Sequence, residues 1–185
     1  MAAIPLPSVG AAATMAALAP AAPVNAVTTP VEGLVSLWAR SGFLVRRLHQ
    51  ISVAIFMEEM AELDLTPVQF GAMSIIAMNP GIEQSAVGSE LGIDRANNAD
   101  VLTRLEKSGL IARQTAAHDR RTNCVFLTEP GRVMVLEANT RLARIQKRFL
   151  GPLTAAERKA FLSLMDKLIA ENNSLGRTVL RLTDR

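Results

Sequence analysis

Two short helix patterns, separated by a glycine turn and followed by a hairpin pattern, occupy the segment from Ile82 to Leu127. The first helix is expected over about Glu83–Leu91, where apolar residues recur at helical spacing, and Gly92 ends it. Asp94 is expected to cap the second helix, which stops before Gly109. Two short helices joined by such a turn are typical of a helix-turn-helix.

The second helix has an apolar side and a polar side. A helical wheel places Val101, Leu102 and Leu105 together, so the opposite face is short and rich in hydrogen-bonding groups. Such side chains near a helix start can reach base edges in the major groove, which accommodates one helix. The residues predicted to contact DNA from this helix are Arg95, Ala96, Asn97, Asp100, Thr103 and Arg104.

Asp100 is unusual on this face because phosphate repels an acid. Its carboxylate either accepts a hydrogen bond from a cytosine amino group or pairs with Arg104 one turn further along the helix. The pair within the helix is the favoured interpretation.

Residues 111–115 and 122–127 are predicted to form two short strands. The charged tip between them indicates a wing whose guanidinium groups enter the minor groove or clamp phosphates, and Asp119 can hold Arg121 extended. A solvated turn is the alternative, but a position directly after a helix-turn-helix favours DNA. The predicted contact residues at the tip are Asp119, Arg120 and Arg121.

Longer helices are predicted on both sides of this module. Apolar periodicity indicates one helix over about Val31–Leu63 and others over about residues 66–78, 129–150 and 154–180, with capping boxes at Thr66 and Thr154. The expected fold is mainly α with a small β-hairpin wing (α+β): a winged helix-turn-helix with N- and C-terminal dimerisation helices. The expected domains are a flexible Ala/Pro-rich arm (1–33), a helical dimerisation region (34–65 and 129–182) and the DNA-binding domain (66–128).

Several motifs in this order resemble the multiple-antibiotic-resistance regulator (MarR) family over about residues 34 to 170. The resemblance implies a homodimeric transcription factor, usually a repressor, which a small ligand or oxidation releases from a palindromic operator. Asn98 and Ala99 depart from the common family pattern, which more often has an apolar residue and a threonine there. The motifs are Leu65-Thr66-Pro67-Val68-Gln69-Phe70, Leu91-Gly92-Ile93-Asp94-Arg95, Leu105-Glu106-Lys107-Ser108-Gly109-Leu110-Ile111, Asp119-Arg120-Arg121 and Leu127-Thr128-Glu129-Pro130-Gly131-Arg132.

The resemblance also implies an effector site between the dimerisation helices and the DNA-binding domain. Aromatic and cationic side chains on the first two helices suggest a phenolic or aromatic acid, or its thioester, as the ligand. Phe and Met at helical spacing are more often core residues, so core packing is the alternative. The candidate effector residues are Trp38, Phe43, Arg46, His49, Phe56, Met60, Phe70 and Met73.

Composition limits how the protein can bind DNA, whether it can form a disulfide and whether it can cross a membrane. The net charge is only +3, so DNA affinity has to come from where charges lie rather than from their sum. The single cysteine, Cys124, excludes an internal disulfide and is expected to be a buried strand residue, although a redox-responsive regulator is an alternative. No apolar run is long enough for a membrane span, and a cytoplasmic location is expected.

No enzyme, cofactor or metal site is expected. The two histidines, His49 and His118, have no partner at metal-ligand spacing, and Glu58-Glu59 near Glu62 indicates a solvated helix face rather than an acid/base pair. An architectural, non-specific DNA-binding protein and a small-molecule carrier that uses the same fold are the alternatives to a sequence-specific regulator.

Overall fold

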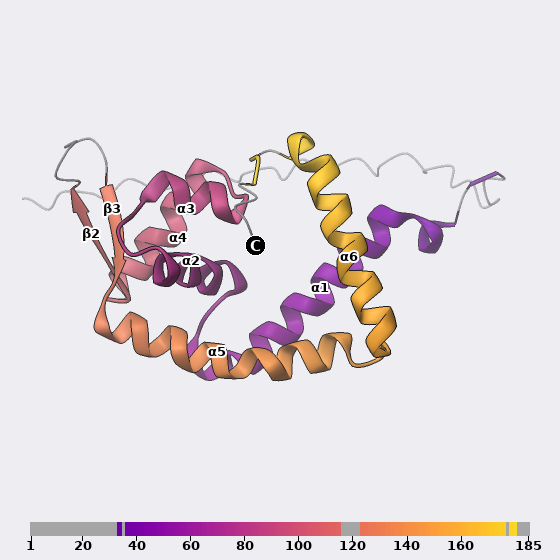
Figure 1. The fold of residues 1–185 in the computed structure, drawn as a ribbon, viewed down its shortest axis with the longest axis horizontal. Helices are drawn as coiled ribbons and strands as arrows, with labels where there is room; N and C mark the ends of the chain where they lie inside the picture. Colours follow the sequence, from indigo (N-terminus) through magenta and orange to yellow (C-terminus); the bar gives the residue numbers. More distant parts are fainter. Residues whose placement is uncertain (1–32, 35, 116–122, 177, 181–185) are drawn as a thin grey trace, which may run out of the picture. The chain divides into compact units, whose positions relative to one another are not determined.

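The computed structural model describes residues 33–34, 36–115, 123–176 and 178–180. The helices and strands of the described residues all lie in one unit, residues 37–185 (Figure 1). The predicted arm therefore lies almost wholly outside the described residues. The wing tip with Asp119, Arg120 and Arg121 lies outside them as well.

The first long helix is shorter than the sequence predicts. α1 spans Ser41–Glu59 instead of residues 31–63, and 3-10 turns at Leu37–Ala39 and Ala61–Leu63 flank it. Residues three apart also line up along a 3-10 turn, so apolar periodicity alone does not separate the two conformations. After the second turn, Asp64 redirects the chain with a left-handed φ of 49°.

α2 (Pro67–Met78) begins at the predicted capping box. The hydroxyl of Thr66 accepts a hydrogen bond from the backbone N–H of Gln69 at 3.3 Å, and the Gln69 side chain accepts one from the backbone N–H of Thr66 at 2.9 Å. These bonds satisfy N–H groups that a helix start leaves unpaired. α2 carries much of the core, with Ala72, Met73, Ile75 and Ile76 buried.

α3 (Gln84–Leu91) and α4 (Arg95–Lys107) form the predicted helix-turn-helix. Gly92 between them has a φ of 67°, a left-handed value that glycine adopts without steric cost. Asp94 caps α4 by accepting a 3.0 Å hydrogen bond from the backbone N–H of Asn97. The predicted turn and cap are both confirmed.

The wing belongs to a three-stranded sheet rather than to an isolated hairpin. β2 (Ile111–Thr115) and β3 (Asn123–Leu127) pair antiparallel, with Arg113 opposite Val125. β1 (Ile82–Glu83), absent from the prediction, pairs with the other edge of β3, so the strand order is β1-β3-β2. A strand of two residues is too short to show the alternation by which strands are recognised in a sequence.

α5 (Glu129–Leu150) leads from β3 past α2 to α1 (Figure 1). Its start is held against the loop after α4, because the hydroxyl of Thr128 donates to the carbonyl of Gly109 at 2.6 Å. A side-chain carbon at Gly131 would collide with the carbonyl of Leu110. The glycine therefore permits a close backbone approach that joins α5 to the helix-turn-helix.

Ion pairs fasten the second half of α5 to the end of α1 and to the 3-10 turn that follows it. Arg148 contacts the carboxylates of Glu58 at 2.7 Å and Glu59 at 2.8 Å. Arg141 donates to the backbone carbonyl of Glu59 at 3.1 Å and to the carboxylate of Glu62 at 2.9 Å. The hydrogen bond from Arg148 holds the pKa of the Glu59 carboxyl below its ordinary value. The predicted solvated acidic face is thus a contact surface for α5.

α6 (Ala155–Asn172) begins at the second predicted capping box, formed by Thr154 and Glu157, but ends eight residues before the predicted residue 180. The Asn173 side chain accepts a hydrogen bond from the backbone N–H of Leu180 at 2.9 Å and donates one to its carbonyl at 2.8 Å. These bonds replace the helical pattern and turn the chain back. Leu180 then lies where a side chain at Gly92 would contact it.

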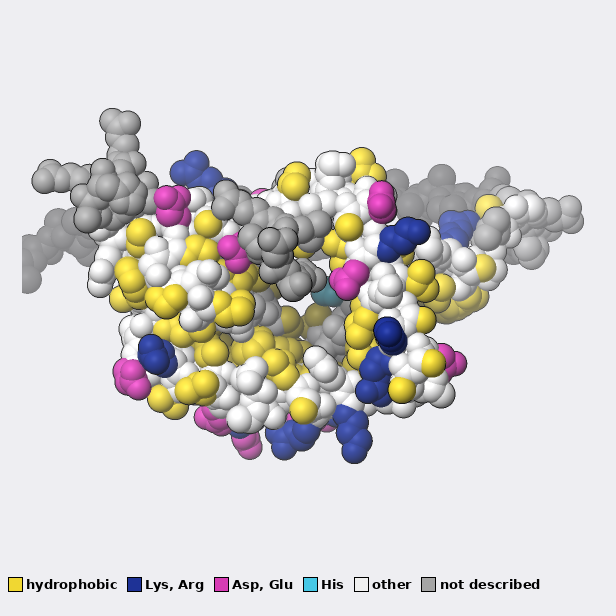
Figure 2. Space-filling model, in the orientation of Figure 1, with side chains coloured by type: hydrophobic (Ala, Val, Ile, Leu, Met, Phe, Trp, Pro, Cys, Tyr) yellow, Lys and Arg dark blue, Asp and Glu magenta, His cyan; other side chains and the backbone are white. Residues whose placement is uncertain are grey.

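Large apolar side chains stay exposed on α1 and α6 (Figure 2). No residue of α6 is buried, although the helix is 18 residues long. In the ranges that the structure covers, no helix combines the length and apolar character needed to cross a bilayer. The exposed apolar residues are Leu44, Val45, Leu48, Ile51 and Met57 on α1 and Leu162, Leu164, Leu168 and Ile169 on α6.

Candidate nucleic-acid interface

One side of α4 is exposed and polar, as predicted. The opposite side anchors the helix, because Leu102 and Leu105 are fully buried in the core. At the N-terminus of α4, the capping carboxylate of Asp94 offsets the positive charge of Arg95 and of the unpaired N–H groups. The predicted DNA-contacting residues that are exposed are Arg95, Ala96, Asn97, Asp100 and Arg104.

Asp100 and Arg104 form the ion pair that the sequence favoured. A nitrogen of the Arg104 guanidinium lies 2.9 Å from a carboxylate oxygen of Asp100, and both side chains are more than half exposed. Such an exposed pair contributes at most about 1 kcal/mol, so phosphate can compete for the arginine. The pair also masks the acid on a surface that would otherwise repel DNA.

Asn97 is held by the residue that caps its own helix. Its side-chain nitrogen donates a 2.9 Å hydrogen bond to the carboxylate of Asp94, in addition to the backbone bond of the cap. An asparagine reads adenine by using its donor and its acceptor together. The amide has two N–H protons, so one can donate to Asp94 while the other and the side-chain oxygen contact the base.

Thr103 is less accessible than the wheel predicts. It is half-buried, and its hydroxyl accepts a 3.0 Å hydrogen bond from Arg113 of β2. Arg113 also pairs with Glu106 at 3.3 Å, so β2 braces the second half of α4. The sequence pattern does not point to Arg113, because its partners lie on another element and no spacing rule links them. Thr103 faces β2. Because its hydroxyl oxygen accepts the bond from Arg113, the hydroxyl proton remains available for donation to DNA.

Asn98 is buried at 4% exposure, on the core side of α4. Its side-chain nitrogen donates a 2.7 Å hydrogen bond to the backbone carbonyl of Gln84, the first residue of α3. A side chain at Gly88 would come within about 3.0 Å of the Asn98 amide, so the glycine makes room for it. Asn98, which stands where the family more often has an apolar residue, thus joins the two helices of the helix-turn-helix.

The predicted effector residues fall into two groups, one in the core and one at the surface. Phe56, Met60 and Met73 are buried in the core, and Phe70 packs against Phe56 with 6.0 Å between ring centroids. These four side chains contribute to the core of the described residues, and an effector role for them stays a prediction.

The other group lies at the start of α1. The rings of Trp38 and Phe43 meet edge to face at 4.9 Å, and the Arg46 guanidinium lies 5.3 Å from the Phe43 centroid. Trp38, in the 3-10 turn before α1, is 72% exposed, and His49 is exposed on α1 itself. An effector role for these residues stays a prediction.

Cys124 is half-buried rather than fully buried and lies on β3 opposite Glu83 and Gln114. In the described part of the chain, no three His, Cys, Asp or Glu side chains gather in a way that could hold a metal ion. The exposed face of α4 can interact with a partner through hydrogen bonds and charge.

Comparison with known proteins agrees with this geometry. A model of the MarR family matches residues 63–122. The transcriptional regulator HosA of Escherichia coli O127:H6 is 34% identical over 125 residues, which are 68% of this chain and 91% of HosA.

Two solved structures resemble the fold closely. The repressor CouR, bound to a 23-mer DNA duplex, is 31% identical, with a TM-score of 0.68 over 71% of this chain and 94% of CouR. BpsR of Bordetella bronchiseptica, whose DNA binding is regulated by 6-hydroxynicotinic acid, is 31% identical, with a TM-score of 0.70 over 74% of this chain and 97% of BpsR. CouR is also known bound to p-coumaroyl-CoA.

Proposed function

The chain belongs to the MarR family of transcriptional regulators, and we propose that it is a cytoplasmic, homodimeric repressor that a small aromatic or acyl-type anion releases from a palindromic operator. The observation that carries this proposal is α4, a helix whose apolar side is buried against α2 and whose exposed side is polar. Such a helix can enter the major groove while the core holds its orientation.

The DNA contacts are divided by position. Arg95, Ala96, Asn97, Thr103 and Arg104 meet bases and phosphates in the major groove, and Asp100 limits which bases are accepted. Arg120 and Arg121 engage the neighbouring minor groove, with Asp119 holding Arg121. The DNA complex of the related repressor CouR supports duplex DNA as the partner.

A second copy of the chain covers the exposed apolar faces of the terminal helices. An 18-residue helix without a buried residue is expected to pack against another protein surface. Two-fold symmetry then sets the two α4 helices about one turn of DNA, roughly 34 Å, apart. In this arrangement, residues 34–65 and 129–182 form the dimerisation region and residues 66–128 the DNA-binding domain.

The ligand class is supported by relatives. BpsR responds to an aromatic acid, and CouR binds an aromatic acyl thioester. A ligand shifts the protein towards a DNA-free state only by the difference between its affinities for the two states. We therefore expect release from DNA to depend on ligand concentration and to follow ligand binding.

A gel-shift titration tests the proposal. The full chain is titrated onto the DNA upstream of its own gene, cut into short duplexes, with excess random duplex present at a fixed salt concentration. Retention of one duplex that contains an inverted repeat, and its release by aromatic acids, are the expected results. Equal retention of all duplexes would instead identify an architectural DNA-binding protein, and no retention at low salt would contradict any DNA-binding function.

A further inference from the structure

The chain turns back after α6 and lies against the helix-turn-helix of its own subunit (Figure 1). We call residues 178–180 the strap. The side chain of Leu180 lies at the turn between α3 and α4, where a β-carbon on Gly92 would be 3.7 Å from it. Thr178 lines a hollow together with residues of α3 and with Arg95 of α4. Two separate contacts therefore place the strap on the DNA-binding domain.

One asparagine side chain holds the strap to the end of α6. Asn173 belongs to the 3-10 turn Asn173–Leu175, which follows α6 directly. Its side chain accepts a 2.9 Å hydrogen bond from the backbone N–H of Leu180 and donates a 2.8 Å bond to the carbonyl of the same residue. Gly176 permits this tight return, because a β-carbon there would lie 3.2 Å from the carbonyl oxygen of Thr178. The strap is thus bonded to α6 at one end of its path and packed on the helix-turn-helix at the other.

Alternate residues of the strap face the DNA-binding domain. Thr178 and Leu180 are half-buried, whereas Val179 between them is 57% exposed. An extended segment shows this alternation when one of its sides lies against protein. The contact removes apolar surface of Leu180 from water, which stabilises the docked strap.

The strap lies beside the DNA-facing side of α4 and not over it. Arg95 and Ala99 line the hollow that Thr178 also lines, and a helical wheel places both on a flank of α4. α4 can therefore enter a groove of DNA with the strap in place. The exposed residues of α4 that do not line this hollow are Ala96, Asn97, Asp100 and Arg104.

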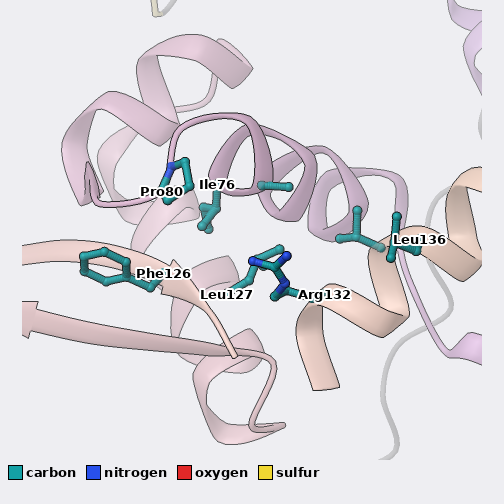
Figure 3. Close-up of a pocket in the computed structure, with 8 residues that line it drawn as sticks. Ile76, Pro80, Phe126, Leu127, Arg132 and Leu136 are labelled. Atoms are coloured by element: carbon teal, nitrogen blue, oxygen red, sulfur yellow. The ribbon is translucent and has the colours of Figure 1, made fainter. Parts of the chain in front are cut away.

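A connection between the dimerisation helices and the DNA-binding domain, at the start of α5, is incompletely packed. A hollow of about 340 Å³ lies where α5 meets the end of α2 and β3 (Figure 3). Side chains of all three elements line it, among them Ile76, Phe126 and Arg132. Protein interiors have few voids larger than a water molecule, so this junction leaves the DNA-binding domain room to shift. The strap supplies a further restraint on the same domain.

We propose that the strap restrains the helix-turn-helix relative to α6, with Asn173 and Leu180 as positioning residues for operator binding. The effect on the operator rests on the proposed function, namely that the two α4 helices of a dimer contact one inverted repeat. Both helices meet their grooves together only when they are held at one separation. A restraint on each DNA-binding domain raises the effective concentration of the second contact at that separation and lowers it at others.

Pulsed EPR on the full-length protein tests the restraint without DNA. Spin labels are attached through Lys107→Cys on α4 and Lys167→Cys on α6, two exposed positions. Cys124→Ser removes the native thiol, and an excess of unlabelled protein leaves at most one labelled chain in each dimer. The distances between the labels then report where α4 lies relative to α6 within one chain.

Two variants remove the restraint, and each has an exposed neighbour as its control. Leu180→Ala removes the side chain that packs at the turn, and Asn173→Ala removes both hydrogen bonds to the strap. Both are expected to broaden the distribution of label distances, because a segment with fewer contacts moves more freely. Val179→Ala and Ser174→Ala are expected to give the wild-type distribution.

The operator found in the gel-shift titration provides a second readout. Fluorescence anisotropy compares duplexes that carry the natural inverted repeat, the same repeat with base pairs inserted between its halves, and one half alone. Leu180→Ala is expected to reduce the preference for the natural spacing about fivefold and to leave affinity for the single half unchanged. A variant whose helix-turn-helix is merely less stable would lose affinity for all three duplexes.

Different results overturn the strap and the proposed function. The strap is wrong if Leu180→Ala and Asn173→Ala give the wild-type distance distribution, whatever the protein does with DNA. The positioning role is wrong if the distribution broadens without a change in spacing preference, or if affinity for the single half falls as much as affinity for the operator. If the wild-type protein retains no duplex, the proposed function and the positioning role both fail, while a broadened distribution still supports the strap as a restraint.

Discussion

The side-chain nitrogen of Asn98 donates a 2.7 Å hydrogen bond to the backbone carbonyl of Gln84 and so ties α4 to the first residue of α3. The two residues are fourteen positions apart, and the asparagine is buried. The angle between α3 and α4 determines the direction in which the exposed side of α4 faces. This buried bond therefore helps to hold the exposed residues of α4 in position to contact DNA.

Asn98→Ala is expected to lower the free energy of unfolding by about 1 to 3 kcal/mol, because the variant loses a buried hydrogen bond. Urea unfolding followed by circular dichroism measures this change. Asn97→Ala, one position along on the exposed side, serves as the control and is expected to have a smaller effect on stability. Equal unfolding midpoints for Asn98→Ala and the wild type would contradict a structural role for the bond.

Asp100→Asn is expected to strengthen binding to random duplexes by about fivefold, equivalent to roughly 1 kcal/mol, and to relax which bases are accepted. The change removes an acid from the DNA-facing surface and releases Arg104, which lies 2.9 Å from it. Fluorescence anisotropy at several salt concentrations provides the measurement. A loss of affinity confined to one operator would show that Asp100 instead accepts a hydrogen bond from a base.

Asn97→Ala and Arg121→Ala are expected to affect DNA binding in different ways. Loss of Asn97 changes which bases are tolerated in the operator, whereas loss of Arg121 weakens binding to all sequences and reduces the salt slope by about one. Competition with a set of single-base operator variants distinguishes the two outcomes. Equal losses on specific and random DNA for Asn97→Ala would remove the base-reading role proposed for it.

Leu168→Asp on α6 is expected to dissociate the dimer, with the dissociation constant raised about thirtyfold or more by a charge placed in an apolar interface. Leu168 is 63% exposed in the single subunit, so the subunit itself is expected to remain folded. Ser163→Asp, which lies on the opposite side of the same helix, is the control. Sedimentation velocity measures both, and an unchanged dimer in Leu168→Asp would exclude this face of α6 as the interface.

The contact between α1 and α5 is expected to weaken in acid. The hydrogen bond from Arg148 lowers the pKa of the Glu59 carboxyl in the folded protein, and the charge of Arg144 at 3.2 Å acts in the same direction. The stabilisation is therefore complete above the ordinary pKa of 4.5 and is lost as the pH falls through the lowered value.

Urea unfolding at a series of pH values measures this dependence. Glu59→Gln is expected to be less stable than the wild type at neutral pH and to lose less stability in acid. Parallel pH profiles for the two proteins would show that Glu59 contributes nothing to the acid sensitivity.

Local signals determined most of the secondary structure from the sequence. The capping boxes at Thr66 and Thr154, the Asp94 cap and the glycines after α3 and α4 set helix ends by hydrogen bonds and steric limits that act within a few residues. The pair between Asp100 and Arg104 was predictable for the same reason, because residues four apart are neighbours on a helix.

Apolar periodicity predicted the wrong bounds for a helix where an α-helix and a 3-10 turn share the same spacing. Apolar steps of three and four residues continue through the 3-10 turns on both sides of α1, so the predicted helix was too long. α6 ends early because Asn173 binds the backbone of Leu180, seven residues away, and no spacing rule anticipates that contact.

The sequence alone determined the winged helix-turn-helix and the polar side of α4, because capping, turns and amphipathicity are properties of neighbouring residues. Only the tertiary structure decided which predicted effector side chains fill the core, that Arg113 braces Thr103, that acids of α1 bind arginines of α5, and that α2, β3 and α5 enclose a hollow beside Arg132. These features depend on contacts between residues far apart in the chain, and such contacts exist only once the helices have packed.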